Sequence, residues 1–279
     1  MKNTRALSVC NLVALLVQIS ISYATQFKFI NTKDVGEISN QYNSLFTPAA
    51  ITFAIWGVIY ISLFAFCIYH IVMAYRHPPH HAANDDLHRI SYWFILNNLA
   101  AATWLIVWTQ DRIQGSLVLI AFQLVTLIII HLRTGIHDTS RSIGSKIFTQ
   151  IPLSIYFGWI TIATIANASV YLSAIHWNGF GLGYPAELWA RIMISVSVFI
   201  ALLVILTRGN VSYGIVVLWA LYGIIIKLES TNAAMYGDII QTTWIGLGII
   251  SFASVIQLFR NLLADGTENK RFPEASPLK

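Results

Sequence analysis

Eight apolar segments take up most of this chain, and each is long enough to cross a lipid bilayer. A spanning helix needs roughly 20 mainly apolar residues, and the segments lie at about 6–24, 49–75, 91–109, 115–132, 149–175, 188–207, 211–228 and 241–259. Only 10% of the 279 residues are charged, against about a quarter in soluble domains. The longest polar stretches, residues 25–46, 133–148 and 260–279, are too short for a soluble domain. The sequence therefore predicts an all-α, polytopic transmembrane bundle of about eight spans.

The distribution of positive charge predicts the orientation of this bundle. If the N-terminus is cytoplasmic, twelve of the 17 Lys and Arg residues lie on the cytoplasmic side and five on the other. Cytoplasmic loops of membrane proteins carry such an excess. We therefore expect an integral protein of the plasma membrane, the inner membrane of a bacterium, with both termini cytoplasmic and residues 25–46 facing outward. The net charge of +5 then reflects orientation and indicates no nucleic-acid partner.

The first segment has two interpretations. Its basic start, apolar run and the Ser-Tyr-Ala at residues 22–24 also resemble a secretory signal peptide, whose cleavage would leave seven spans. We favour a retained helix, because Asn11 and Gln18 form a polar stripe that a packed helix can use. The two cysteines, Cys10 and Cys67, lie in apolar runs, and we expect both to be small buried hydrophobic residues.

Three of the segments carry large rings, small residues and amides on one helical face. These residues recur at helical spacings of three, four, seven and eleven: Phe53, Trp56 and Tyr60 in segment 49–75; Asn97, Ala101, Trp104 and Trp108 in segment 91–109; Tyr156, Trp159, Ala163 and Asn167 in segment 149–175. Amides and indoles need partners within hydrocarbon, so the three faces should turn inward. For any single residue, packing against a neighbouring helix is the simpler explanation. Three such faces together favour a pocket for a flat apolar ligand.

These patterns resemble the TspO/MBR family, the tryptophan-rich sensory proteins. The family has a Thr/Asn-Pro-Pro turn followed by Trp, Phe and Trp-x-x-x-Tyr, and a fifth helix with Tyr-x-x-Trp-x-x-x-Ala-x-x-x-Asn. The matching residues here are Thr47-Pro48, Phe53, Trp56 and Tyr60; Tyr156, Trp159, Ala163 and Asn167; and the third-span pair Trp104 and Trp108. The departures are Ala49 for the second proline, Ile51 for the Trp after it, Ala101 for a third-helix Asn, Ile155 for a fifth-helix Pro, and one residue fewer between Phe53 and Trp56.

The resemblance covers roughly residues 6–172 and implies a five-helix core. It implies a porphyrin such as protoporphyrin IX, or a sterol-like lipid, as ligand for sensing, regulation or transport, without a required cofactor, and a homodimer in many members. The residues that it marks as ligand-binding are Phe53, Trp56, Tyr60, Trp104, Trp108, Tyr156, Trp159 and Asn167. We expect residues 1–175 to form this core, 176–260 to add three spans, 261–279 to form a polar cytoplasmic tail, and residues 25–46 to act as a lid.

Two other function classes stay open. The extra spans could form the path of a small-solute permease. An intramembrane enzyme ranks last, because the sequence shows no nucleophile–base pair and no paired carboxylates. The stretch at residues 77–88 gathers four histidines and two aspartates, but its spacing fits no rigid metal site. Its Pro-Pro pair favours an extended, solvated loop, and we predict no metal site there.

Overall fold

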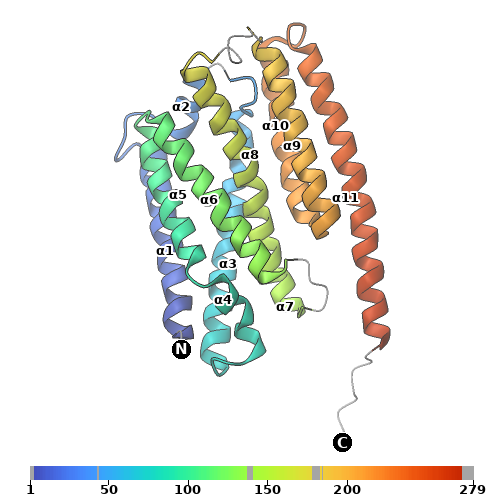
Figure 1. The fold of residues 1–279 in the computed structure, drawn as a ribbon. Coiled ribbons are helices and arrows are strands. Elements are labelled where there is room, and N and C mark those ends of the chain that lie inside the picture. Colours follow the sequence, from blue (N-terminus) through green and yellow to red (C-terminus); the bar gives the residue numbers. More distant parts are fainter. Residues whose placement is uncertain (1–2, 43, 137–140, 178–182, 184, 272–279) are drawn as a thin grey trace, which may run out of the picture.

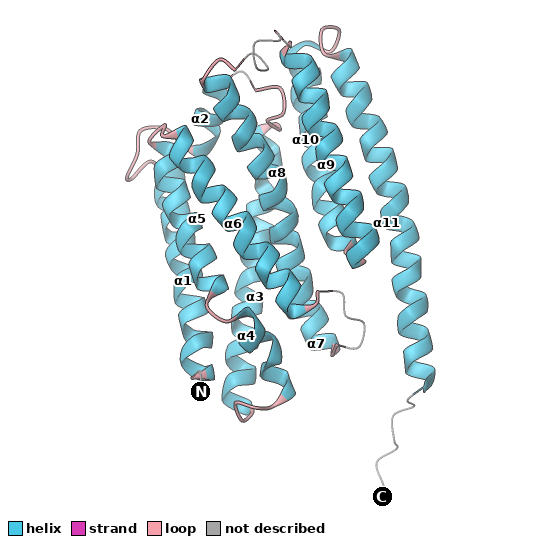
Figure 2. Ribbon diagram, viewed as in Figure 1, coloured by secondary structure: helices cyan, strands magenta, loops and turns pink. Residues whose placement is uncertain are grey.

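The computed structural model describes residues 3–42, 44–136, 141–177, 183 and 185–271, with side chains up to residue 263. Over these residues the chain is helical and contains no strand (Figure 2). The long helices are α1 (Thr4–Gln26), α3 (Ile55–Arg76), α5 (Trp93–Thr109), α6 (Ile113–Thr134), α8 (Ile151–Ala174), α9 (Ala186–Arg208), α10 (Val211–Asn232) and α11 (Gly237–Arg271). The short elements are α2 (Val35–Gln41), the 3₁₀ turns η1 (Ala50–Ala54) and η2 (Ala82–Asn84), α4 (Asp85–Ile90), α7 (Ile143–Ser145) and the π-helical turn η3 (Lys146–Gln150). Each of the eight predicted segments coincides with a long helix.

The helices have the length and surface of membrane spans. Seven are long and apolar enough to cross a bilayer, and the pair α4–α5, bent by 44°, makes an eighth if taken as one span. Large apolar side chains point outward, such as Ile61, Phe199 and Phe252, which are 75%, 66% and 70% exposed. So much exposed apolar surface is compatible with lipid as the surrounding medium. The predicted polytopic helical bundle is thus confirmed.

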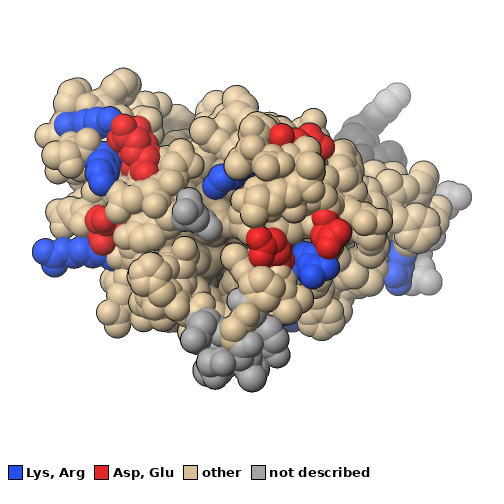
Figure 3. All heavy atoms as spheres, turned by 90° about the horizontal axis from the view of Figure 1, so that it is seen from above, with Lys and Arg blue, Asp and Glu red and all other residues tan. Residues whose placement is uncertain are grey.

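Helix α8 occupies the centre of the bundle (Figure 1). Helices α1, α5 and α6 lie on one side of it and α9, α10 and α11 on the other. The N-terminus and the end of α11 lie at the same end of the bundle, opposite the end that carries α2, which we call the α2 end. Looking onto the α2 end, Figure 3 shows acidic and basic side chains mixed in small groups, with uncharged residues between them.

One hydrophobic core joins the two sides. It runs from Leu15 in α1 to Ala253 in α11, so α1 is a packed member of the bundle. Helix α10 approaches α8 closely, because Gly158 lies where a Cβ atom would be only 3.0 Å from the Tyr213 carbonyl oxygen. Beside it, the Asn210 amide, which caps α10, donates a hydrogen bond of 2.9 Å to the Ser154 hydroxyl. Helix α10 therefore packs tightly on α8, and α9 and α11 pack against α10 and against each other.

Two sequence expectations are wrong. Cys10 is exposed on the surface of α1, whereas Cys67 is buried as expected; an apolar run does not distinguish a lipid-facing position from a core position. The stretch after Pro79 is not an extended loop either, because η2 and α4 occupy residues 82–90. Asp86 in α4 is buried and forms an ion pair of 3.4 Å with Arg141.

Candidate ligand-binding site

The three aromatic faces converge in the half of the bundle nearer the α2 end. They surround two adjoining cavities of ≈ 40 and ≈ 30 Å³. The walls of both include Phe53, Trp104, Trp159 and Ala163. The larger cavity lies beneath α2, and the smaller one lies deeper, among α1, α3, α5, α6 and α8. We call the two together the aromatic site.

The rings from η1 and α3 meet the ring of Trp159 edge-on. The Phe53 and Trp159 ring centroids are 5.7 Å apart with the planes at 82°, and those of Trp56 and Trp159 are 6.2 Å apart at 81°. Tyr60 stacks on Trp56 at 5.3 Å. Edge-to-face pairs are a favoured arrangement of aromatic rings. The result is a cluster of rings whose members can be separated without breaking a covalent or ionic contact.

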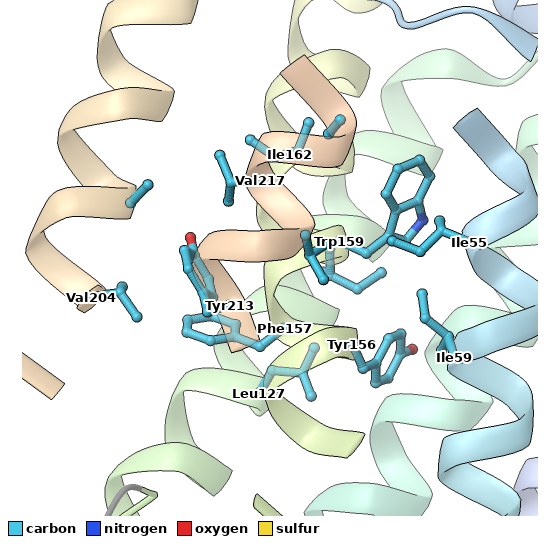
Figure 4. Packing of buried hydrophobic residues seen from close by; sticks show 14 of the residues in the cluster. Ile55, Ile59, Leu127, Tyr156, Phe157, Trp159, Ile162, Val204, Tyr213 and Val217 are labelled. Atoms are coloured by element: carbon cyan, nitrogen blue, oxygen red, sulfur yellow. The ribbon is translucent and has the colours of Figure 1, made fainter. Parts of the chain in front are cut away.

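Helix α8 presents a different face to each half of the bundle. Tyr156 and Trp159 project toward Ile55 and Ile59 of α3, whereas Phe157 projects toward α10 (Figure 4). There the Phe157 and Tyr213 ring centroids are 5.0 Å apart. The helical spacing in the sequence thus separates residues of the aromatic site from residues that attach the last three helices.

The rings of α5 link the aromatic site to α2. Trp104 and Trp108 stack with centroids 5.4 Å apart. Trp108 also lines the larger cavity, and its indole N–H donates a hydrogen bond of 3.1 Å to the Val35 carbonyl oxygen in α2. Asn97, on the same predicted face, instead bonds α6 through the Thr126 hydroxyl at 2.7 Å. Asn167 lines the larger cavity and shares a hydrogen bond of 3.2 Å with Ser116 of α6.

Several polar atoms at this site are buried without a hydrogen-bond partner. They are both amide atoms of Gln18, the Tyr156 hydroxyl and the indole nitrogens of Trp104 and Trp159. An unpaired buried polar group is costly, and most folded proteins leave few of them. Gln18, Trp104 and Trp159 line the cavities, whereas the predicted site residue Tyr156 lines neither and lies beside them, with its ring centroid 6.2 Å from that of Trp56. The three lining side chains mark a place that suits a ligand with hydrogen-bonding groups.

Gln18 and Gln123 line the smaller cavity but are absent from the site that the sequence indicates. The sequence shows Gln18 as a polar residue in an apolar run, but it does not indicate which helices Gln18 faces. The Gln123 amide donates to the Leu119 carbonyl of its own helix at 3.4 Å, so only part of its hydrogen-bonding capacity is used.

Helix α2 covers the larger cavity and is held by polar contacts. Its first turn carries a capping box between Asp34 and Glu37, and Glu37 also forms an ion pair of 2.7 Å with Lys28. At its other end, the Tyr42 hydroxyl donates a hydrogen bond of 2.7 Å to Asp111, in the turn between α5 and α6. The expected loop-shaped lid therefore includes a short capped helix.

Two of these contacts define a pH range for the attachment of α2. The hydrogen bond from Lys28 lowers the pKa of Glu37 below its ordinary value of 4.5, so the contact with Lys28 is fully present above pH 4.5 and is lost as pH falls through the lowered pKa. Burial, together with the bond to Asp111, raises the pKa of Tyr42 to about 12. That contact is fully present below pH 10.0 and is lost as pH rises toward 12.

Helix α10 holds the segment that forms one wall of the aromatic site. The Ala49 N–H donates a hydrogen bond of 2.9 Å to the Gly223 carbonyl oxygen, and the Trp219 indole donates one of 2.9 Å to the Thr52 carbonyl oxygen. A proline at position 49 would have no N–H to donate. The departure from Pro-Pro at this turn thus provides a backbone bond to α10.

Gly223 makes this approach sterically feasible. An ideal Cβ at this position would lie 2.0 Å from the Thr52 hydroxyl oxygen, which is far inside van der Waals contact. Thr52 directly precedes Phe53, a wall residue of both cavities. The packing of α10 therefore fixes where the Phe53 ring lies.

The histidine-rich stretch lies at the opposite end of the bundle (Figure 1). His77 and His81 stack with ring centroids 4.1 Å apart, and the His88 Nε2 lies 3.0 Å from the Pro79 carbonyl oxygen. Across the part of the chain that the structure describes, no three His, Cys, Asp or Glu side chains are grouped so that they could hold a metal ion.

Comparison with protein families gives a match that covers most of the chain. A family model described as TSPO-like protein matches residues 8–256, so the match includes α9 and α10 and much of α11. No curated protein and no solved structure gives a significant match.

Proposed function

This chain belongs to the TSPO-like protein family, and we propose that it binds a flat hydrophobic ligand of the porphyrin class at the aromatic site, for sensing, regulation or transport of that ligand. The observation that carries the proposal is the convergence of Phe53, Trp104 and Trp159 from three elements around both cavities. Aromatic walls with a few polar groups are typical of pockets for such ligands.

The unpartnered polar atoms support a ligand that carries polar substituents. The indole N–H groups of Trp104 and Trp159 can only donate, whereas the amide of Gln18 can donate and accept. Carboxylate or carbonyl groups at the rim of a porphyrin-like ring offer acceptors for these donors. A purely hydrocarbon ligand would leave them unpaired, which favours a ligand with polar groups at its edge over a hydrocarbon.

Binding requires the cavities to open. Volumes of ≈ 40 and ≈ 30 Å³ are far below the roughly 300–1,000 Å³ of pockets for drug-sized ligands. The cavities share Trp104 and Trp159, so a change of rotamer of these rings would merge them. Helix α2, which lies above the larger cavity, would have to move aside to admit the ligand. We therefore propose that binding separates the ring cluster and displaces α2.

The permease alternative receives less support. A path between α8 and α10 would have to pass through the contacts of Gly158 with Tyr213 and of Ser154 with Asn210, which fill that interface.

Titration with protoporphyrin IX tests the proposal. Saturable quenching of tryptophan fluorescence is expected for the native chain in detergent or nanodiscs, and the Trp104→Phe/Trp159→Phe variant should weaken the midpoint by about tenfold, which is about 1.4 kcal/mol. Trp244→Phe, at an exposed position on α11, is the matched control and should leave the midpoint unchanged. An unchanged midpoint in the double variant would show that the proposed site is wrong.

A further inference from the structure

A separate pocket of ≈ 290 Å³ lies at the α2 end, between the core and the added helices. Its walls come from residues 44–46, the end of α8 with His176 and Trp177 just beyond it, and the start of α9. We call it the junction pocket. It shares no wall residue with the two cavities of the aromatic site. A volume close to 300 Å³ already suits a small organic molecule without rearrangement.

Two polar groups at the junction pocket are able to donate a hydrogen bond and have no partner. Ser44 is 6% exposed, and its hydroxyl has no hydrogen-bond partner. The indole N–H of Trp189 is also buried and without a partner, and it can only donate. Ser169, Ser173 and His176 add further polar side chains to the lining. Among the residues that the structure describes, no acidic side chain lines this pocket.

Lys227 brings positive charge behind one wall of the pocket, without being a wall residue itself. The Lys227 ammonium is 3.5 Å from the Ser44 carbonyl oxygen, in a partly buried position on α10. Lys227 has no acidic partner within salt-bridge distance among the described residues. Helix α9 starts at Ala186, a wall residue, and lacks a side-chain cap, so the positive end of its dipole faces the same region. Glu187, in the first turn of α9, is not a wall residue.

The other half of the junction pocket is aromatic. The Trp177 and Trp189 ring centroids are 4.6 Å apart with the planes at 63°, and Phe46 lies on the same wall. Two rings at a steep angle form a corner that fits a flat or chain-like apolar group. We propose that the junction pocket binds a small anionic amphiphile, with its carboxylate or phosphate near Lys227, Ser44 and the Trp189 N–H and its apolar part in the tryptophan corner.

Calorimetric titration with phenylacetate and with its neutral analogue 2-phenylethanol, on the full chain in phosphatidylcholine nanodiscs, tests this proposal. Phenylacetate should bind saturably and at least about tenfold more tightly, since only it offers a charged acceptor. Lys227→Gln should remove that difference. Lys33→Gln, which removes a lysine at the same end of the bundle, should preserve it. Trp189→Phe, which keeps a ring but deletes the N–H, should weaken phenylacetate binding in the same direction. Ser44→Ala gives a second, milder variant if Lys227→Gln folds poorly.

Repeating the titration in a second lipid composition distinguishes the two possible sources of the anionic ligand. Competition by added phosphatidylglycerol would identify a lipid headgroup as the occupant, and phenylacetate binding that is unaffected would identify a free small acid; either outcome supports an anionic amphiphile. Equal binding of phenylacetate and 2-phenylethanol, or no effect of Lys227→Gln and Ser44→Ala, would overturn the proposal. This inference does not rest on porphyrin binding, and the Lys227 variant should retain protoporphyrin quenching.

Discussion

Gly223→Ala is a sharp test of the link between α10 and the aromatic site. The added Cβ would lie 2.0 Å from Oγ1, 2.8 Å from Cγ2 and 2.9 Å from Cβ of Thr52. Rotating the Thr52 side chain exchanges one clashing branch for another, so η1 and α10 must move apart. Reaching an ordinary contact of 3.4 Å from 2.0 Å takes about 1.4 Å of movement (3.4 − 2.0).

The expected cost is about 1–3 kcal/mol, the usual range for overpacking a filled interior. Because Phe53 follows Thr52, the same movement should displace a wall of both cavities. We expect a lower midpoint of thermal unfolding in nanodiscs and a weaker midpoint for protoporphyrin quenching, both measured on one preparation. The two effects should appear together, because one displacement causes both.

A second-site change separates this mechanism from general damage. Thr52→Ala removes the two nearest atoms and leaves Cβ at 2.9 Å, so Gly223→Ala/Thr52→Ala should recover much of both losses. The Thr52 hydroxyl is buried without a partner, so Thr52→Ala alone should be nearly neutral. Gly248→Ala, with no atom within 4 Å of the added Cβ, is the control. A Gly223→Ala variant with native stability and affinity, or one that Thr52→Ala does not rescue, would refute the reasoning.

Three further predictions concern residues around the aromatic site: Ala49 beside η1, Gln18 in the smaller cavity, and Asp111, which holds α2. Ala49→Pro fits the backbone, whose φ is −61°, but removes the N–H that is bonded to Gly223. We expect the free energy of unfolding to fall by about 0.5–1.5 kcal/mol. An unchanged free energy of unfolding would count against the bond. Gln18→Leu should weaken protoporphyrin binding several-fold without lowering thermal stability, because it removes two unpartnered buried atoms; equal affinity would show that Gln18 does not contact the ligand. Asp111→Asn weakens the attachment of α2 and should speed porphyrin dissociation in stopped-flow experiments. The native rate should be flat between pH 4.5 and pH 10.0 and rise outside that range, as Glu37 titrates below it and Tyr42 above it. A native rate that changed within that range would contradict the assignment of these contacts.

Helical periodicity made the aromatic faces visible from the sequence. Tyr156 and Trp159 are separated by one turn, so a helix places them together whatever surrounds it, and the structure finds both on the face toward α3. The same periodicity could not assign partners. It placed Asn97 with Trp104, although Asn97 bonds α6. A repeat of 3.6 residues defines a face but not the neighbour of each residue on that face.

Contacts between residues far apart in the chain could not be predicted from the sequence. Nothing near Ala49 indicates that its N–H bonds Gly223, 174 positions later (223 − 49). Gln18 is a similar case, because its role depends on which helices surround α1. Helix α2 was missed for another reason, since short helices in polar stretches lack a long apolar pattern. Its signal was the spacing of Asp34 and Glu37, three residues apart, which is typical of a capping box.

The most direct measurement is a structure of the protein with protoporphyrin IX bound. We expect the macrocycle between Phe53, Trp104 and Trp159, with one or both indoles in a new rotamer. We also expect α2 to be displaced from its contact with Trp108, and a polar group of the ligand to lie near Gln18. A porphyrin bound on the lipid-facing surface or in the junction pocket, with the three rings still in mutual contact, would contradict this expectation.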